Sequence, residues 1–172
     1  DLEYYENTQA QPRADYFEII AQAHQAVFRN HSPLLMCEPG RALVARSASL
    51  LCRVIHVRSE TSTLFINDGI YGGLQEQCIA DLRLPLRLWR NEMQLDVADE
   101  PIAFEVFGPT CDPVDRLPRP LFLPATIQTG DYLEFGLMGA YGSATSTRFN
   151  GFGSGRYVNV EQGWKKLGSD HN

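Results

Sequence analysis

Apolar side chains near the start of the chain recur at helical intervals. Spacings of three and four residues predict a helix over about 15–29, whose apolar face carries Tyr16, Ile19, Ile20, Ala23 and Val27. Asp15 and Glu18 form a capping box at its start, and His31-Ser32-Pro33 ends it. The pattern is that of an amphipathic helix that packs on one side.

A short apolar run, Leu34–Cys37, follows this helix. Such a run predicts a buried parallel strand over about 34–38, and the loop 38–41 (Glu38-Pro39-Gly40-Arg41) comes directly after it. In α/β barrels, functional residues lie in the loops that follow such strands. One helix and one buried strand are too little for a domain, so we expect residues 1–48 to be the remnant of another unit.

Beyond residue 48 the helical spacing gives way to short strand-like segments: 49–57, 62–67, 82–89, 102–107 and 131–137. Turns containing glycine or proline separate them, and 156–160 could form one more strand. The pattern predicts a mainly β fold, in which residues 49–172 form a C-terminal antiparallel β-domain or small β-barrel.

Composition excludes several classes of partner. The 172 residues are 44% hydrophobic and 21% charged, which is typical of a globular domain. The net charge of −6 argues against nucleic acid, because phosphate binding requires clustered Lys and Arg. No apolar run is long enough to cross a bilayer, so a membrane is not an expected partner either. A cationic small molecule would suit this charge better.

The cysteines indicate neither a metal site nor a disulfide framework. Cys37, Cys52, Cys78 and Cys111 are scattered, with no Cys-x-x-Cys pair and no histidine at metal-ligand spacing. The chain opens on Asp1, and its polar first residues lack the apolar core of a signal peptide. We expect reduced thiols, a cytoplasmic location and a sequence that begins within a longer protein.

Lysine is confined to one place in the sequence. The only two lysines, Lys165 and Lys166, are adjacent in a polar C-terminal stretch. Any chemistry that requires a buried lysine would therefore have to take it from outside this chain.

Several segments could carry chemistry, although each also has a purely structural explanation. Loop 38–41 sets a carboxylate beside an arginine, which is most often an ion pair but could also keep a pyridine nitrogen protonated and bind a phosphate. Segment 68–73 is a glycine-rich connection, and 108–115 places a cysteine next to an aspartate in a turn. Segments 138–141 and 149–152 set aromatic residues among small ones, as core packing also would.

The order of these motifs is more specific than any one of them. Along the chain stand Cys-Glu-Pro-Gly-Arg, Asn-Asp-Gly-Ile-Tyr-Gly, Gly-Pro-Thr-Cys-Asp, Gly-Asp-Tyr-Leu, Met-Gly-Ala-Tyr and Phe-Asn-Gly-Phe. From about Asp15 onward, this series closely resembles the fold-type III pyridoxal-phosphate-dependent decarboxylases of ornithine, lysine, diaminopimelate and arginine. The Gly-Pro-Thr-Cys-Asp form resembles the ornithine/lysine branch.

The resemblance implies that pyridoxal 5'-phosphate is the cofactor. Glu38 would be the partner of the pyridinium nitrogen and hence a catalytic residue. Gly40, Arg41 and Tyr141 would bind the cofactor phosphate. The resemblance also implies that residues 1–48 are the last helix and strand of an α/β barrel of the TIM type, the rest of which is absent from this chain. The lysine that holds the cofactor and the histidine that stacks on its ring would come from the earlier barrel strands, in agreement with the lack of a buried lysine here.

The resemblance also assigns residues to the substrate. Cys111 would reach across a homodimer interface and direct protonation of the reacting carbon after carbon dioxide leaves. Asp112 would contact the distal amino group of a diamino acid, again across the interface, and Phe149 would form part of the pocket wall. The expected function is decarboxylation of ornithine or lysine to a diamine, a step of polyamine biosynthesis.

Departures from the family pattern leave the substrate open. Segment 75–81 lacks the Tyr-Asp-His triplet that animal-type ornithine decarboxylases carry there, and Gly142 follows Tyr141 where threonine is common. Alternatives are an inactive or regulatory relative that acts as a binding module, a diaminopimelate decarboxylase, and an amino-acid racemase of the same architecture. The Gly-Pro-Thr-Cys-Asp motif disfavours the racemase.

Overall fold

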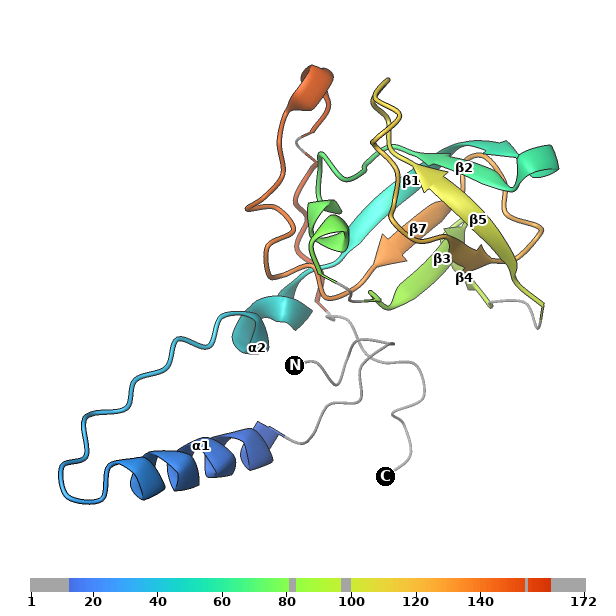
Figure 1. Ribbon diagram of the computed structural model, residues 1–172. Helices are drawn as coiled ribbons and strands as arrows, with labels where there is room; N and C mark the ends of the chain where they lie inside the picture. Colours follow the sequence, from blue (N-terminus) through green and yellow to red (C-terminus); the bar gives the residue numbers. More distant parts are fainter. Residues whose placement is uncertain (1–12, 81–82, 97–99, 154, 162–172) are drawn as a thin grey trace.

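The computed structural model describes residues 13–80, 83–96, 100–153 and 155–161 (Figure 1). Its main feature is one seven-stranded sheet with the strand order β4-β3-β7-β1-β2-β5-β6. The strands are β1 (Leu50–Arg58), β2 (Thr63–Ile66), β3 (Leu86–Arg90), β4 (Met93–Leu95), β5 (Ile102–Phe107), β6 (Leu121–Leu123) and β7 (Tyr132–Phe135).

Helical elements are few and, apart from the first, short. The helix α1 (Arg13–Val27) confirms the helix predicted over about 15–29. The remaining elements are α2 (Arg41–Val44) and the 3-10 turns η2 (Ala45–Ser47), η3 (Ser59–Thr61), η4 (Gln75–Cys78) and η5 (Phe149–Gly151). Most of the sheet is therefore connected by turns and irregular segments.

The pairing of the strands confirms the mainly β fold class. β1 lies at the centre and pairs antiparallel with β7 on one side and β2 on the other. The β3–β7, β3–β4 and β5–β6 pairs are also antiparallel, whereas β2 and β5 run parallel. Periodicity did not predict β4 and β6, because three residues are too few to show alternation.

The core lies on one face of the curled sheet. Along β1, Cys52 and Val54 are fully buried while Leu51 is 55% exposed, which is the two-residue period of a strand with one packed face. The best-buried side chains of the other strands are Leu64, Ile66, Leu88, Val106, Leu123 and Leu133. These side chains belong to one buried cluster.

An ion pair with a buried carboxylate links β3 to the residue before β7. Arg90, at the end of β3, donates from Nε and Nη2 to the two carboxylate oxygens of Asp131 at 2.7 and 2.8 Å. The Gln128 amide donates to the same carboxylate, of which only 1% is exposed. Because both charges are paired and hydrogen-bonded, the burial of Asp131 is tolerated.

Residues 34–38, predicted as a strand, form none in this structure. Leu34 is 87% and Met36 is 76% exposed, and no strand of the described residues lies beside them. A parallel strand needs neighbours to pair with, and without them this apolar run stays irregular. Residues 156–160 likewise form no strand.

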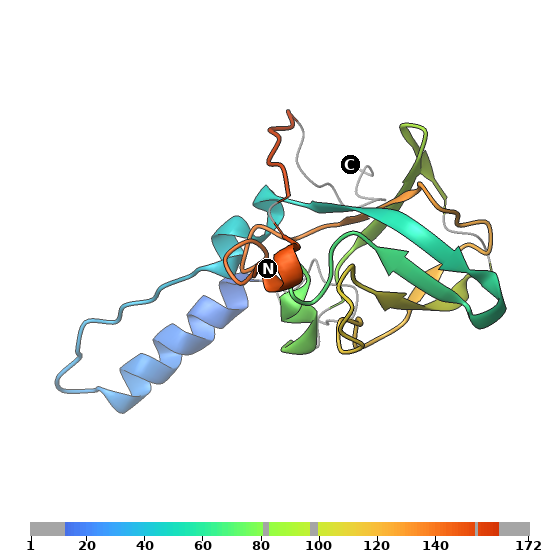
Figure 2. The same cartoon turned by 90° about the horizontal axis from the view of Figure 1, so that it is seen from above.

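Residues 13–40, here called the N-terminal arm, comprise α1 and the irregular segment that follows it. The arm stands away from the sheet in both ribbon views (Figures 1 and 2). The apolar face of α1 is exposed, with Ile19 at 61% and Val27 at 72%. Apolar surface of this kind marks a place where another part of a protein packs.

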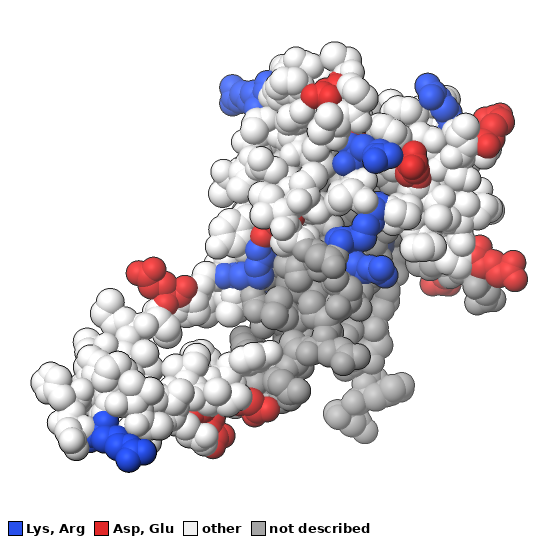
Figure 3. Space-filling model, in the orientation of Figure 1, with Lys and Arg blue, Asp and Glu red and all other residues white. Residues whose placement is uncertain are grey.

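The surface carries charges of both signs without a single dominant patch on the face seen in Figure 3. Among the described helices, none has both the length and the apolar character needed to cross a membrane.

Candidate functional site

Two of the predicted motifs meet because β2 and β5 run parallel. The register pairs Thr63 with Glu105 and Phe65 with Phe107, so the carboxyl ends of both strands lie at one edge of the sheet. The segment after β2 (67–74, the β2 loop) and the segment after β5 (108–115, the cysteine turn) therefore emerge side by side. Nothing in either motif alone predicts this meeting.

A short hydrogen bond joins the two segments. The Tyr71 hydroxyl donates to Oδ2 of Asp112 at 2.5 Å, and the Val114 amide donates to Oδ1 at 2.9 Å. These bonds favour the charged carboxylate and lower the pKa of Asp112, the Tyr71 bond more strongly. The same bond raises the pKa of the Tyr71 hydroxyl. Asp112 is thus held in one orientation as an anion, ready for a cationic group.

Replacing Tyr71 with phenylalanine is expected to raise the pKa of Asp112, because the hydrogen bond that lowers this pKa most is lost. The lowered pKa stabilises the folded protein at neutral pH, and this contribution is lost as the pH falls through the carboxyl pKa. A carbon-13 NMR titration of the Asp112 carboxyl measures the change. Tyr132→Phe, in β7, is the matched control. An Asp112 titration that Tyr71→Phe leaves unmoved would contradict the role of this bond.

The other predicted substrate residues join the same cluster. The ring of Phe149 stacks on Tyr71, with the ring centres 4.3 Å apart and the planes inclined by 27°. Asn150 donates from Nδ2 to Sγ of the exposed Cys111 at 3.4 Å. The amide and hydroxyl of Thr147 both donate to the Tyr71 carbonyl at 2.8 Å. Cys111, Asp112 and Phe149 therefore lie in one cluster of this chain, and their roles towards a substrate stay predictions.

A second cluster contains two of the residues expected at the cofactor phosphate. The Arg41 guanidinium lies 5.0 Å from the centre of the Tyr141 ring. It also forms a two-pronged ion pair with Glu76 of η4, in which Nη1 donates to Oε2 at 3.0 Å and Nη2 donates to Oε1. Sequence reasoning missed Glu76, because 35 positions separate it from Arg41.

The remaining loop residues fit a phosphate group in part. Gly40 precedes α2, and a Cβ built on it would meet no atom within 4 Å, so its backbone is open to approach. A guanidinium retains donors after pairing with one carboxylate, so Arg41 can serve an anion as well as Glu76. Glu38 is exposed on the irregular segment before α2, and its role towards the pyridine nitrogen stays a prediction.

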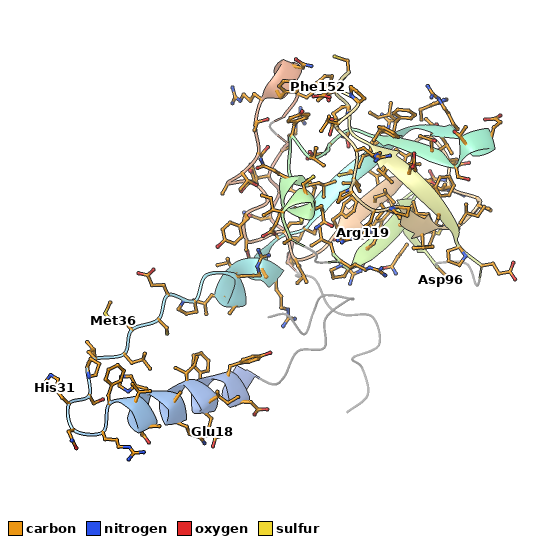
Figure 4. The ribbon with its side chains drawn as sticks, in the orientation of Figure 1. Glu18, His31, Met36, Asp96, Arg119 and Phe152 are labelled. Carbon is orange, nitrogen blue, oxygen red and sulfur yellow. The ribbon has the colours of Figure 1, made fainter. Side chains whose placement is uncertain are left out.

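A cavity of about 300 Å³ opens beside the first cluster, between the β2 loop, the cysteine turn and residues near Phe152. Figure 4 shows Phe152 at the end of the sheet domain away from the arm that carries Met36. Asp68 lines this cavity, and its burial raises the pKa of its carboxyl, with the charge of Asp115 adding to the effect. Within the described part of the chain, no group of three or more potential ligands could hold a metal ion.

Comparison with known families agrees with this geometry. The family described as pyridoxal-dependent decarboxylase, C-terminal sheet domain, matches residues 17–139 of the chain. The match covers most of the sequence, including most of α1, the loop 38–41 and the sheet. The chain belongs to this family of pyridoxal-dependent decarboxylases, and the resemblance read from its motifs is confirmed.

Individual relatives point the same way. The chain is 33% identical over 164 residues to the ornithine decarboxylase of Candida albicans, covering 74% of this chain and 34% of that protein. It is 35% identical over 132 residues to the chloroplastic ornithine decarboxylase of Nicotiana glutinosa, covering 72% of this chain and 30% of that protein. The chain thus spans about a third of the length of these curated relatives.

A solved structure of a related enzyme matches most of the fold. The lysine/ornithine decarboxylase of Vibrio vulnificus, complexed with cadaverine, superposes with a TM-score of 0.72 at 28% identity. The match covers 92% of this chain and 41% of that one. The sheet domain is therefore the same in architecture, and the rest of that enzyme has no counterpart in this chain.

Proposed function

We propose that this chain is the C-terminal part of an enzyme that decarboxylates a basic amino acid, ornithine or lysine, to a diamine. The observation that carries the proposal is the cluster on the cysteine turn, where Asp112 is held ionised beside Cys111 and Phe149. An oriented carboxylate suits the distal ammonium group of a diamino acid. An aromatic wall suits its methylene chain.

The cofactor residues have separate tasks in this proposal. When bound, pyridoxal phosphate supplies an electron sink for the charge that remains after carbon dioxide leaves. Arg41, Tyr141 and the Gly40 amide would hold its phosphate, and Glu38 would keep its pyridine nitrogen protonated. Glu76 would orient the Arg41 guanidinium through the ion pair described above.

The reacting carbon must regain a proton after decarboxylation. Cys111 is exposed on its turn, and Asn150 is its hydrogen-bond donor. We assign it to deliver that proton as a general acid. An exposed thiol on a projecting turn can serve the active site of a second copy, so we propose a homodimer in which each site takes Cys111 and Asp112 from the partner.

The exposed apolar surfaces of the N-terminal arm are consistent with the end of an α/β barrel whose other elements are not in this chain. The exposed apolar face of α1 and the exposed run 34–36 are surfaces that the other elements of an α/β barrel would cover. We therefore propose residues 1–48 as the end of that barrel and 49–172 as the sheet domain. The four free cysteines agree with a cytoplasmic enzyme, and a diamine product would place it in polyamine biosynthesis.

The proposal is tested with the full-length protein and with the 172-residue chain side by side. We expect the full-length protein to be yellow from bound cofactor and to release carbon dioxide from ornithine or lysine faster than from arginine or diaminopimelate. We expect the isolated chain to release none, because its only lysines are Lys165 and Lys166. A colourless, inactive full-length protein would favour the regulatory relative, and preference for diaminopimelate would favour that decarboxylase.

A further inference from the structure

Asp115 is a buried carboxylate that the proposed chemistry does not use. It is 1% exposed, although the residues before it in the turn, 109–114, are exposed or half-buried. Its Oδ1 accepts the Ile70 amide at 3.0 Å, and its Oδ2 accepts the Thr110 amide and hydroxyl at 3.1 and 2.8 Å. Burial of a carboxylate without hydrogen bonds would be strongly disfavoured, so these three donors are what allows Asp115 to be buried.

Two glycines make room for this carboxylate. A Cβ built on Gly69 would overlap Oδ1 of Asp115, and one built on Gly108 would overlap both oxygens. The φ angles of these two glycines are not in the left-handed region, so conformational freedom is not the reason for glycine here. The close approach of the carboxylate to both backbones is the reason.

The position of the donors links Asp115 to both the β2 loop and the cysteine turn. Ile70 is adjacent to Tyr71 in the β2 loop, and Thr110 is adjacent to Cys111 in the cysteine turn. The backbone of Asp115 closes the turn as well, since its amide donates to the Asp112 carbonyl at 2.9 Å and its carbonyl accepts the Gly108 amide at 2.8 Å. One carboxylate therefore fixes both ends of the Tyr71–Asp112 hydrogen bond relative to each other.

We propose that Asp115 is a positioning residue that sets substrate specificity. It does so by holding the β2 loop and the cysteine turn in the register that presents Asp112 to the distal ammonium group. The inference rests on the proposed function, because it takes Asp112 as the contact for that group. Asp115 itself would touch neither substrate nor cofactor.

The decisive variant is Asp115→Asn in the full-length enzyme. The asparagine amide has nearly the shape of the carboxylate, but its NH₂ group would face at least one of the three donors. Two donor groups cannot hydrogen-bond to each other. The turn must then shift or lose a bond. We expect the preference for a charged substrate to fall, measured as the ratio of kcat/KM for ornithine to that for its uncharged isostere norleucine. The expected fall is about 10-fold or more, the scale of losing one hydrogen bond to a charged group.

Asp131→Asn is the matched control. Asp131 is also 1% exposed and fully hydrogen-bonded, but it precedes β7, which β1 and β2 separate from β5. General loss of stability would affect both variants, whereas the ornithine-to-norleucine ratio should fall only in Asp115→Asn.

Thr110→Val removes one of the three donors and keeps the carboxylate. It should lower the ratio by a smaller factor, and it tests the inference if Asp115→Asn does not fold.

The outcomes are distinguishable. A full-length parent that shows no preference for ornithine or lysine over their uncharged isosteres would overturn the proposed function and this inference with it. A parent with that preference, whose Asp115→Asn and Thr110→Val variants keep the ratio within about two-fold, would overturn the positioning role alone. An equal fall in Asp131→Asn would also overturn it, because the effect would then reflect stability.

Discussion

Replacing Glu38 with alanine in the full-length protein is expected to lower kcat by about 100-fold or more, the scale seen when one preorganised electrostatic partner is removed. A carboxylate beside the pyridine nitrogen keeps that nitrogen protonated. The protonated ring accepts negative charge as carbon dioxide leaves, so the loss of Glu38 should weaken stabilisation in the transition state. The effect should appear in kcat rather than in KM alone.

The control is Glu18→Ala, an exposed glutamate on the same N-terminal arm (Figure 4). Its carboxylate accepts a hydrogen bond from Gln22 at 3.0 Å on the surface of α1, so its loss should change turnover little. If Glu38→Ala retained turnover within a few-fold of the parent, the role assigned to Glu38 towards the pyridine nitrogen would be wrong.

The sequence predicts well those elements that repeat a pattern over many residues. α1 and the long strands β1 and β5 lie where periodicity placed them. The short strands β4 and β6 escape prediction because three residues carry too little pattern. The apolar run 34–38 was predicted as a strand from its composition, but a strand also requires partners, and the described residues hold none beside it.

The site shows the same division between local and long-range information. The order of motifs named Cys111, Asp112 and Phe149, and the structure brings all three together. No motif could show that Tyr71 would orient Asp112, because that contact depends on the parallel pairing of β2 with β5. Glu76 was missed for the same reason, since its partner is distant in sequence and only folding brings the two together.

In the homodimer that we propose, each active site takes its cofactor residues from one chain and Cys111 from the other. Arg41, at the start of α2, pairs with Glu76 and lies over the Tyr141 ring, whereas Cys111 lies on a turn at the edge of the sheet. Cys111 is exposed there, so its thiol contributes little to the packing of its own chain. A thiol in such a position is available to a neighbouring subunit.

Mixing two inactive full-length variants is expected to restore activity. One variant lacks the lysine that holds the cofactor, and the other is Cys111→Ala. If Cys111 acts in the partner's site, a mixed dimer contains one site with both defects and one with neither. Random exchange makes half of the dimers mixed, so roughly a quarter of the parental activity should return if the sites are independent.

The measurement is carbon dioxide release before and after subunit exchange, with exchange followed separately by differently labelled subunits. Mixing the lysine variant with Asp112→Ala should restore activity in the same way, because Asp112 lies on the same turn and is expected to act on the same substrate. Mixing Cys111→Ala with Asp112→Ala should restore none, since both defects lie on the turn and every site would receive one of them. Confirmed exchange without recovery in the first mixture would place Cys111 in the site of its own subunit, because each mixed dimer would then have one site without the lysine and one site without Cys111.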